Sequence, residues 1–197
     1  MSDFINEIKN TIEPLKDNIY GPLYRCSLTL KDGTFLPCAV LQSRERLVEL
    51  AKRRIKEDMG RKGTLNVPDP YGSIVSSFVS NGNRVNDYEV RSATESKYAI
   101  PLSLLSQIHG ETTMGWTGWV FKMKDGKVFS YGTTFRFEFF QLPENYSFAD
   151  VVEVINHSFV DTSGAVRSLR DIRPWDQDRS GVFRERVYFI CAVDGLE

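Results

Sequence analysis

The segment DQDRSG has oxygen-bearing side chains at the spacing that suits a hard cation. Asp176, Asp178 and Ser180 alternate along the chain, as the first ligands of a calcium loop do. The match then fails, because Val187 stands where such a loop has a bidentate glutamate and Arg179 would repel a cation. A solvated polar turn is the ordinary alternative. We therefore take Asp176, Asp178 and Ser180 as candidate ligands of a divalent cation, and no other cofactor is predicted.

The two histidines of the chain, His109 and His157, are its candidates for general-base chemistry near neutral pH. His109 opens the segment HGETT, which brings an acid, a base and hydroxyl groups close together in sequence. Both histidines are expected at the ends of helices, where a structural role is common. No nucleophile motif, phosphate loop or Cys-x-x-Cys pair accompanies them, so the catalytic residues of an enzyme stay unknown.

Arginines gather around Trp175 in the later part of the chain. Tryptophan and arginine are enriched at the hot spots of protein interfaces. We therefore predict a partner-binding loop made of Trp175, Arg170, Arg173 and Arg179.

A second basic group lies on a predicted helix and consists of Lys52, Arg53, Arg54 and Lys56. If these side chains contacted phosphates, the affinity for nucleic acid would fall steeply with added salt. Acidic residues interleaved with them favour an ordinary solvated helix face instead.

Composition limits the class of protein. With 197 residues, 41% of them hydrophobic, the chain can bury a core as one domain over residues 1–197. The 25 basic and 26 acidic residues leave a net charge of −1, which gives no general attraction to nucleic acid or to anionic membranes. Three cysteines, an odd number, argue against a disulfide framework. Together with the absence of a signal sequence or long apolar run, this predicts a soluble, cytoplasmic protein.

Two hairpins centred on Lys-Asp-Gly are expected to position these residues, at 24–41 and 119–140. Gly33 and Gly126 would close each turn in the left-handed conformation that glycine adopts without steric cost. The resulting register would place Cys26 opposite Cys38.

In the second hairpin the same register pairs Trp119 with Tyr131 in an aromatic core face. It also sets Gly118 against Gly132, which leaves room for a ring, a backbone segment or a ligand.

The order of elements predicts an α+β fold, with a mostly antiparallel sheet built from hairpins and helices packed against it. A helix from Ser43 to near Gly60 follows the first hairpin, and a helix starting at Ser147 follows the second. The shared order suggests a weak internal duplication of a hairpin–helix unit, 24–59 and 116–158. Strands are also expected at 84–90 and 183–193, the latter in the middle of the sheet.

The leading functional hypothesis is a non-catalytic protein-interaction module, an accessory, regulatory or inhibitory subunit that binds a protein through a sheet edge and the Trp175 loop. The alternative is a metal-dependent hydrolase of phosphate esters using Asp176 and Asp178. The third is nucleic-acid binding through the basic helix face. The sequence does not identify the partner, the substrate or the oligomeric state.

Overall fold

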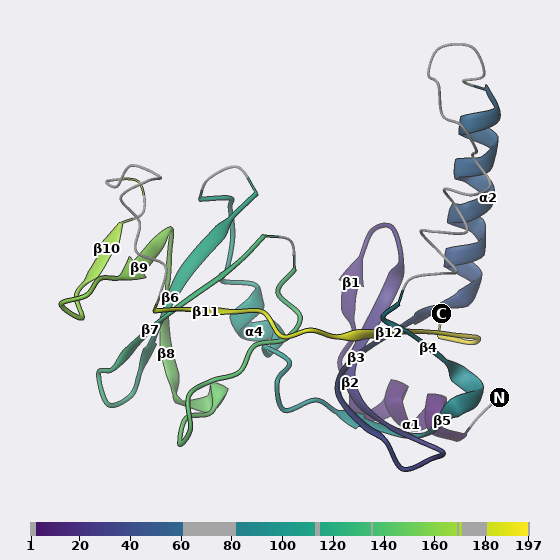
Figure 1. Cartoon of the computed structure of the whole chain (residues 1–197), viewed down its shortest axis with the longest axis horizontal. Helices are drawn as coiled ribbons and strands as arrows, with labels where there is room; N and C mark the ends of the chain where they lie inside the picture. The colour runs from purple at the N-terminus through teal and green to yellow at the C-terminus, as the bar shows by residue number, and fades with distance from the viewer. Residues whose placement is uncertain are drawn as a thin grey trace. The chain divides into compact units, whose positions relative to one another are not determined.

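The computed structural model describes residues 3–60, 82–112, 115–134, 136–168, 170 and 181–196 (Figure 1). The chain divides into two compact units, 1–97 with 188–197 and 98–187, and each has a buried core of its own. The single domain expected over residues 1–197 stays a prediction. No helix among the described residues is long and apolar enough to cross a lipid bilayer.

The first unit is a mixed sheet with helices. Its elements are α1 (Asp3–Thr11), β1 (Leu15–Asp17), β2 (Gly21–Leu30), β3 (Phe35–Ser43), α2 (Arg44–Gly60), β4 (Arg84–Asn86), the 3-10 turn η2 (Asp87–Glu89), β5 (Val90–Glu95) and β12 (Phe189–Val193). The strands lie in the order β1-β2-β3-β12-β4, with β5 also paired to β2. The single strand predicted at 183–193 is wrong in its extent, because Val182–Arg184 pairs in the second unit and only Phe189–Val193 joins this sheet. The predicted central place is confirmed for β12, which lies between β3 and β4.

The prediction of a mostly antiparallel sheet needs correction, because β12 runs parallel to both of its neighbours. In the second unit β11 (Val182–Arg184) also runs parallel to β7 (Val128–Thr133). Hairpin turns force antiparallel pairing only between consecutive strands. A strand that arrives through a long connection is free of that constraint, so the sheets are mixed.

The sheet of the first unit must curl. Strands β4 and β5 lie at opposite ends of the path β5-β2-β3-β12-β4, yet only the three residues of η2 join them. A flat sheet would separate the two end strands by roughly 19 Å at the usual strand spacing. A 3-10 turn that rises about 2 Å per residue spans less than half of that distance. The two ends of the sheet are therefore drawn together.

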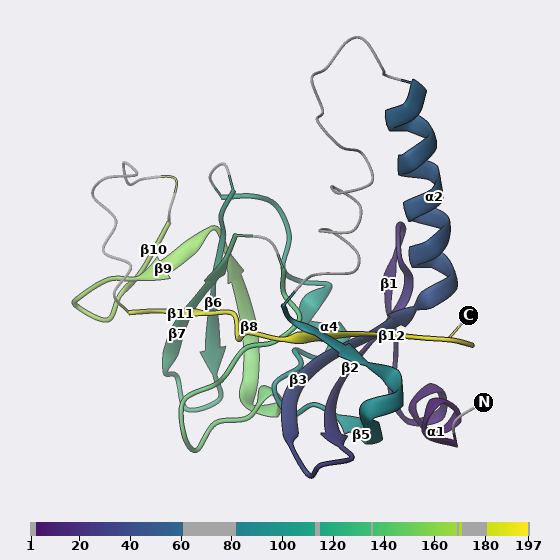
Figure 2. The ribbon, with the colours of Figure 1, turned by 45° about the vertical axis from the view of Figure 1, so that its right-hand side comes forward.

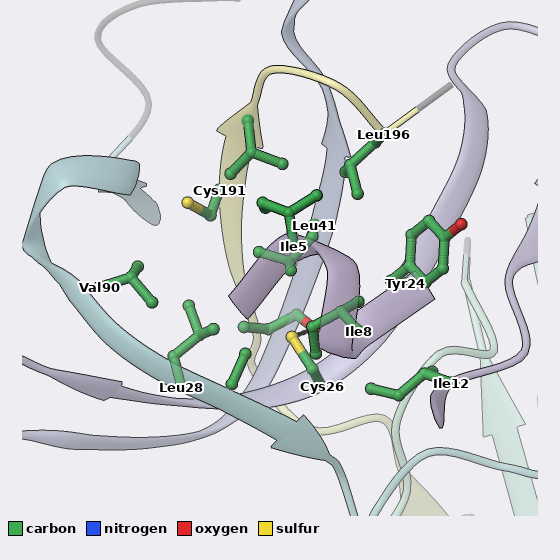
Figure 3. Packing of buried hydrophobic residues seen from close by; sticks show 13 residues of the cluster. Ile5, Ile8, Ile12, Tyr24, Cys26, Leu28, Leu41, Val90, Cys191 and Leu196 are labelled. Atoms are coloured by element: carbon green, nitrogen blue, oxygen red, sulfur yellow. Dashed lines mark hydrogen bonds between the residues drawn. The ribbon is translucent and has the colours of Figure 1, made fainter. Parts of the chain in front are cut away.

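Helix α1 fills the concave side of the curled sheet. Ile5, Ile8 and Ile12 recur on one face of α1, and each is at most 5% exposed. Figure 3 shows them among Leu28, Leu41, Cys191 and other residues of the strands. Helix α1 therefore docks on the sheet through its apolar face.

Helix α2 begins where β3 ends and runs away from the sheet in both Figure 1 and Figure 2. Its predicted start is confirmed, because the Ser43 hydroxyl accepts a hydrogen bond from the Arg46 amide at 3.3 Å, as an N-cap does. Leu47 and Leu50 are its buried residues.

The second unit contains a four-stranded sheet in the order β11-β7-β6-β8 and a separate β9-β10 hairpin. In addition to β7 and β11, its elements are α4 (Leu102–Leu105), β6 (Thr117–Met123), the 3-10 turn η3 (Phe148–Asp150), β8 (Val151–Asn156), β9 (Ser158–Val160) and β10 (Val166–Ser168).

The helix predicted from Ser147 is wrong, because η3 leads directly into strand β8. The segment VVEVIN is rich in β-branched residues, whose stiff side chains favour strands. Val151 and Val154 pack against the core from this strand. The segments 24–59 and 116–158 thus share a hairpin but no following helix, and their duplication stays a prediction.

Three hairpins of the chain turn in the same way. In the first, the Leu30 amide donates to the Thr34 carbonyl at 2.8 Å, and the Gly33 amide donates to the Leu30 carbonyl at 3.0 Å. Equivalent bonds surround Gly126 and Gly164, and all three glycines have φ between 84° and 91°. The hairpin closed by Gly164 joins β9 to β10.

The expected pairing of Cys26 with Cys38 is wrong. An irregularity between Cys26 and Leu28 shifts the register of the first hairpin, so Cys26 lies opposite Ala39. Since successive side chains of a strand point to opposite faces, this shift directs Cys38 away from Cys26. Both are buried free thiols, as is Cys191, and burial raises the pKa of the Cys26 and Cys191 thiols, that of Cys191 to about 12.

The register predicted for the second hairpin is confirmed. Trp119 pairs with Tyr131, and Gly118 pairs with Gly132. The Trp119 ring lies 5.2 Å from the Phe140 ring, edge to face, and both side chains are fully buried. These aromatic residues form the centre of the core of the second unit.

The glycine pair of the second hairpin makes room for a ring of the same chain. A Cβ atom added to Gly132 would lie only 2.0 Å from Cζ2 of Trp116, so the indole packs directly on the glycine backbone. The guanidinium of Arg184 lies 4.8 Å from the Trp116 ring. The close approach expected at this level of the hairpin is therefore made by Trp116.

Gly132→Ala should destabilise the protein by about 1–3 kcal/mol, because the added methyl group overlaps the Trp116 ring. Urea unfolding followed by tyrosine and tryptophan fluorescence measures this loss. Gly181→Ala is the matched control, since nothing lies within 4 Å of a Cβ at Gly181. Adding Trp116→Leu to Gly132→Ala should recover part of the loss. Wild-type stability in Gly132→Ala would contradict this packing.

Candidate functional site

Most residues of the predicted Trp175 loop and cation site lie outside the described residues, namely Trp175, Arg173, Arg179, Asp176, Asp178 and Ser180. Their roles stay predictions. Arg170 is described, and its exposed side chain lies near the histidines considered below. Over the described ranges, no group of three or more His, Cys, Asp or Glu side chains is placed to hold a metal ion.

The four basic residues predicted to bind nucleic acid are exposed on α2. They are Lys52, Arg53, Arg54 and Lys56. Arg53 lies 3.8 Å from the Glu57 carboxylate one helical turn further on, which is the pairing expected of a solvated helix face. Their role in binding nucleic acid stays a prediction.

The end strand β8 of the second unit is poorly suited to pairing with another chain. Its pairing with β6 passes from Glu153 to Val151 and skips Val152, which leaves a bulge at the edge. At its other end, the Asn156 side chain donates to the Gln107 carbonyl at 2.7 Å and accepts from the His109 amide at 3.2 Å. Bulges and covering segments are the devices that blunt sheet edges against further pairing.

The structure brings the two histidines of the chain to one place, the turn between β8 and β9. His157 occupies this turn with φ 53°, so the expectation that it ends a helix is wrong. Its Nδ1 atom lies 3.2 Å from the Thr112 hydroxyl, which accepts a hydrogen bond from the Gly118 amide at 3.1 Å. The segment HGETT thus meets His157 through Thr112.

The surroundings of His157 disfavour its charged form. Burial of the imidazole lowers its pKa, and the positive charges of Arg170 and His109 lower it further. Because Thr112 accepts from Gly118, its hydroxyl proton is available to the unprotonated Nδ1 of His157. The ring also abuts Gly110, where an added Cβ would lie 2.9 Å from His157 Cε1. These contacts fix the turn and hold the Thr112 hydroxyl against the imidazole.

The lowered pKa of His157 makes the free energy of unfolding depend on pH. The unfolded chain binds a proton near the ordinary histidine pKa of about 6.5, whereas the folded chain binds it only at lower pH. The contribution of His157 to the free energy of unfolding is therefore fully present above about pH 6.5, and it is lost as the pH falls below that value. Urea unfolding between about pH 7.5 and pH 5 should show a steeper loss for wild type than for His157→Asn.

Asparagine is the matched replacement at position 157, because it tolerates a left-handed backbone and does not titrate. If the free energy of unfolding fell equally with pH in wild type and in His157→Asn, His157 would not titrate as described.

The first unit offers a second candidate site, at the carboxyl ends of its parallel strands. Strands β3, β12 and β4 run in the same direction, so their carboxyl ends meet at one edge of the sheet. Arg44, Asp194 and Asp87 follow these three strands directly. Crevices at this edge are where ligands bind in many sheets with parallel strands.

Arg44 joins the three strand ends. Its guanidinium lies 2.7 Å from an Asp87 carboxylate oxygen and 2.9 Å from an Asp194 carboxylate oxygen. It also donates to the Ala192 carbonyl at 2.9 Å. The planar guanidinium suits several acceptors at fixed angles, so this network holds η2, α2 and the end of β12 together.

Tyr88 stands between two hollows at this edge. It is the middle residue of η2, and 68% of its surface is exposed. Asp87 and Tyr88 line both hollows, which have volumes of about 690 and 380 Å³. We call these two residues, with the hollows on either side, the Tyr88 ridge.

The single strand expected at 84–90 is wrong, because β4 ends at Asn86 and η2 follows it at Asp87–Glu89. This interruption creates the Tyr88 ridge. The Glu89 carboxylate accepts from the Asn86 amide at 3.4 Å and from the Asn86 side chain at 3.3 Å. Asn86 followed three residues later by Glu89 has the spacing of a capping box, a signal in the sequence that marks a turn into a helix. That signal could have located η2.

Comparison of the chain with protein-family models, with curated proteins and with solved structures found no match. The function is therefore argued from the geometry of the chain itself.

Proposed function

We propose that the chain is a non-catalytic protein-interaction module whose partner binds over the Tyr88 ridge. The observation that carries this proposal is an aromatic side chain, 68% exposed, between two hollows. Tyrosine is enriched at interface hot spots, because it adds a large contact area and a hydroxyl group at low conformational cost. The ridge follows the end strand β4 directly. Binding of the partner through a sheet edge remains a proposal.

The residues on either side of Tyr88 are held by contacts within the first unit, so a partner can bind with little reorganisation of the chain. Arg44 fixes Asp87, the residue before Tyr88, and the Lys31 amide donates to the carbonyl of Glu89, the residue after it, at 2.8 Å. A surface that is ordered before binding loses less conformational entropy when its partner arrives. The Trp175 loop, with Arg170 at its start, remains a second proposed contact region. A cytoplasmic location also remains a proposal.

The two other hypotheses stay predictions. Metal-dependent hydrolysis of phosphate esters depends on Asp176 and Asp178, which lie outside the described residues. Nucleic-acid binding depends on the exposed residues of α2.

Selection of peptides from a random display library, on immobilised wild-type protein, tests the proposed function. Enriched peptides should bind wild type and lose at least about tenfold in affinity on Tyr88→Ala. Because Tyr88 is exposed, the substitution should change the free energy of unfolding by less than about 0.5 kcal/mol. Phe35→Ala is the matched control, since it removes another aromatic side chain that is 59% exposed in the same unit.

Two outcomes count against the proposed function. One is that no peptide is enriched over a blank surface. The other is that the enriched peptides bind Tyr88→Ala as tightly as they bind wild type.

A further inference from the structure

From the charges around the larger hollow we infer that the partner presents an acidic segment with an apolar side chain to the Tyr88 ridge. This inference rests on the proposed function and names the chemistry of the partner. It is carried by two features of the hollow of about 690 Å³, the two cations at its rim that have no ion pair among the described residues and the apolar residues that line it.

The charged groups of the rim differ in whether they form ion pairs. Lys31 and Arg91 line the hollow and are exposed, and neither has an ion-pair partner within the described part of the chain. Asp87 and Asp194 are the carboxylates of the lining, and each is paired with Arg44. The charges of the lining that have no ion pair are therefore both positive, although the lining as a whole, with two cations and two carboxylates, is neutral.

Two further acids next to the hollow are held by hydrogen bonds of their own. The Glu45 carboxylate accepts from the backbone of Gly195, a lining residue, and from the Ser43 hydroxyl. Glu89 follows Tyr88 directly, but its carboxylate accepts hydrogen bonds from Asn86 on the β4 side of the ridge. Carboxylates of a partner would consequently meet Lys31 and Arg91. Complementary charge of this kind raises the association rate and selects among partners.

Apolar side chains from three elements line the same hollow. Phe4 and Ile5 come from α1, Val90 from β5 and Val193 from β12. A hollow of about 690 Å³ is within the range of roughly 300–1,000 Å³ found for ligand pockets, so it has room for one or two side chains of a partner. Contacts with phosphates alone would leave these apolar residues unused. The observations thus favour an acidic protein segment over a nucleic acid.

The composition of the selected peptides tests this inference separately from the proposed function. Peptides whose binding needs Tyr88 should be more acidic than the starting library and should contain a large apolar residue. A fluorescent version of the best peptide should lose about tenfold in affinity when its acidic residues are replaced by glutamine or asparagine, measured by anisotropy.

Charge variants of the protein test whether Lys31 and Arg91 contact the acidic residues of the peptide. Lys31→Gln with Arg91→Gln should weaken binding of that peptide about tenfold. Lys52→Gln with Lys56→Gln removes the same charge from the exposed face of α2 and should leave binding within about twofold, because interactions beyond a Debye length are screened. Single-stranded DNA should compete with the peptide only at much higher concentration.

Three results would overturn the inference. Peptides that need Tyr88 but are neutral or basic would leave the proposed function standing and refute the acidic partner. Equal losses in the two pairs of charge variants would show a general effect of charge. Displacement of the peptide by equimolar DNA would assign the hollow to polyanions such as nucleic acids.

Discussion

The first unit depends on one constraint, the length of the connection between the two end strands of its sheet. Three residues, Asp87–Glu89, join β4 to β5 across a path of five strands. Since so short a turn cannot span a flat sheet, the strands must curl. The curl creates the concave side that α1 fills with Ile5, Ile8 and Ile12. The ends of β3, β12 and β4 lie close enough for Arg44 to join Asp87 and Asp194, because these strands are parallel neighbours.

The same connection explains why a functional surface is expected at this place. Tyr88 is the middle residue of η2, so the turn that closes the sheet also presents the most exposed aromatic side chain recorded in the described residues. Its neighbours on both sides are held by Arg44 and by the hairpin at Lys31. The His157 turn differs, because its polar groups bond to one another and leave less for a partner to contact.

Features set by neighbouring residues could be predicted from the sequence. The hairpins, the start of α2 after Ser43 and the pairing of Trp119 with Tyr131 depend on local turn and packing preferences. The parallel pairing of β12 could not be predicted, because it depends on a strand nearly 150 residues from β3 in sequence. A helix was expected from Ser147, but the β-branched residues of VVEVIN form the strand β8 instead. The ridge was missed because the Asn86–Glu89 capping signal lay inside an apparent strand. The clustering of Arg44, Asp87 and Asp194 could not be predicted, because it depends on the pairing of strands that are far apart in the sequence.

Hydrogen exchange of the Lys31 amide, followed by NMR, tests most directly whether the end of η2 is fixed against the first hairpin. This amide donates to the Glu89 carbonyl and joins the hairpin to the end of η2. If the end of η2 is held as described, the Lys31 amide should exchange within about tenfold of the rate for Leu28 in β2, because both would then open only with the core. Exchange at the rate of an unstructured peptide would contradict the account, since the end of η2 would then not be held and Tyr88 would not have a fixed position.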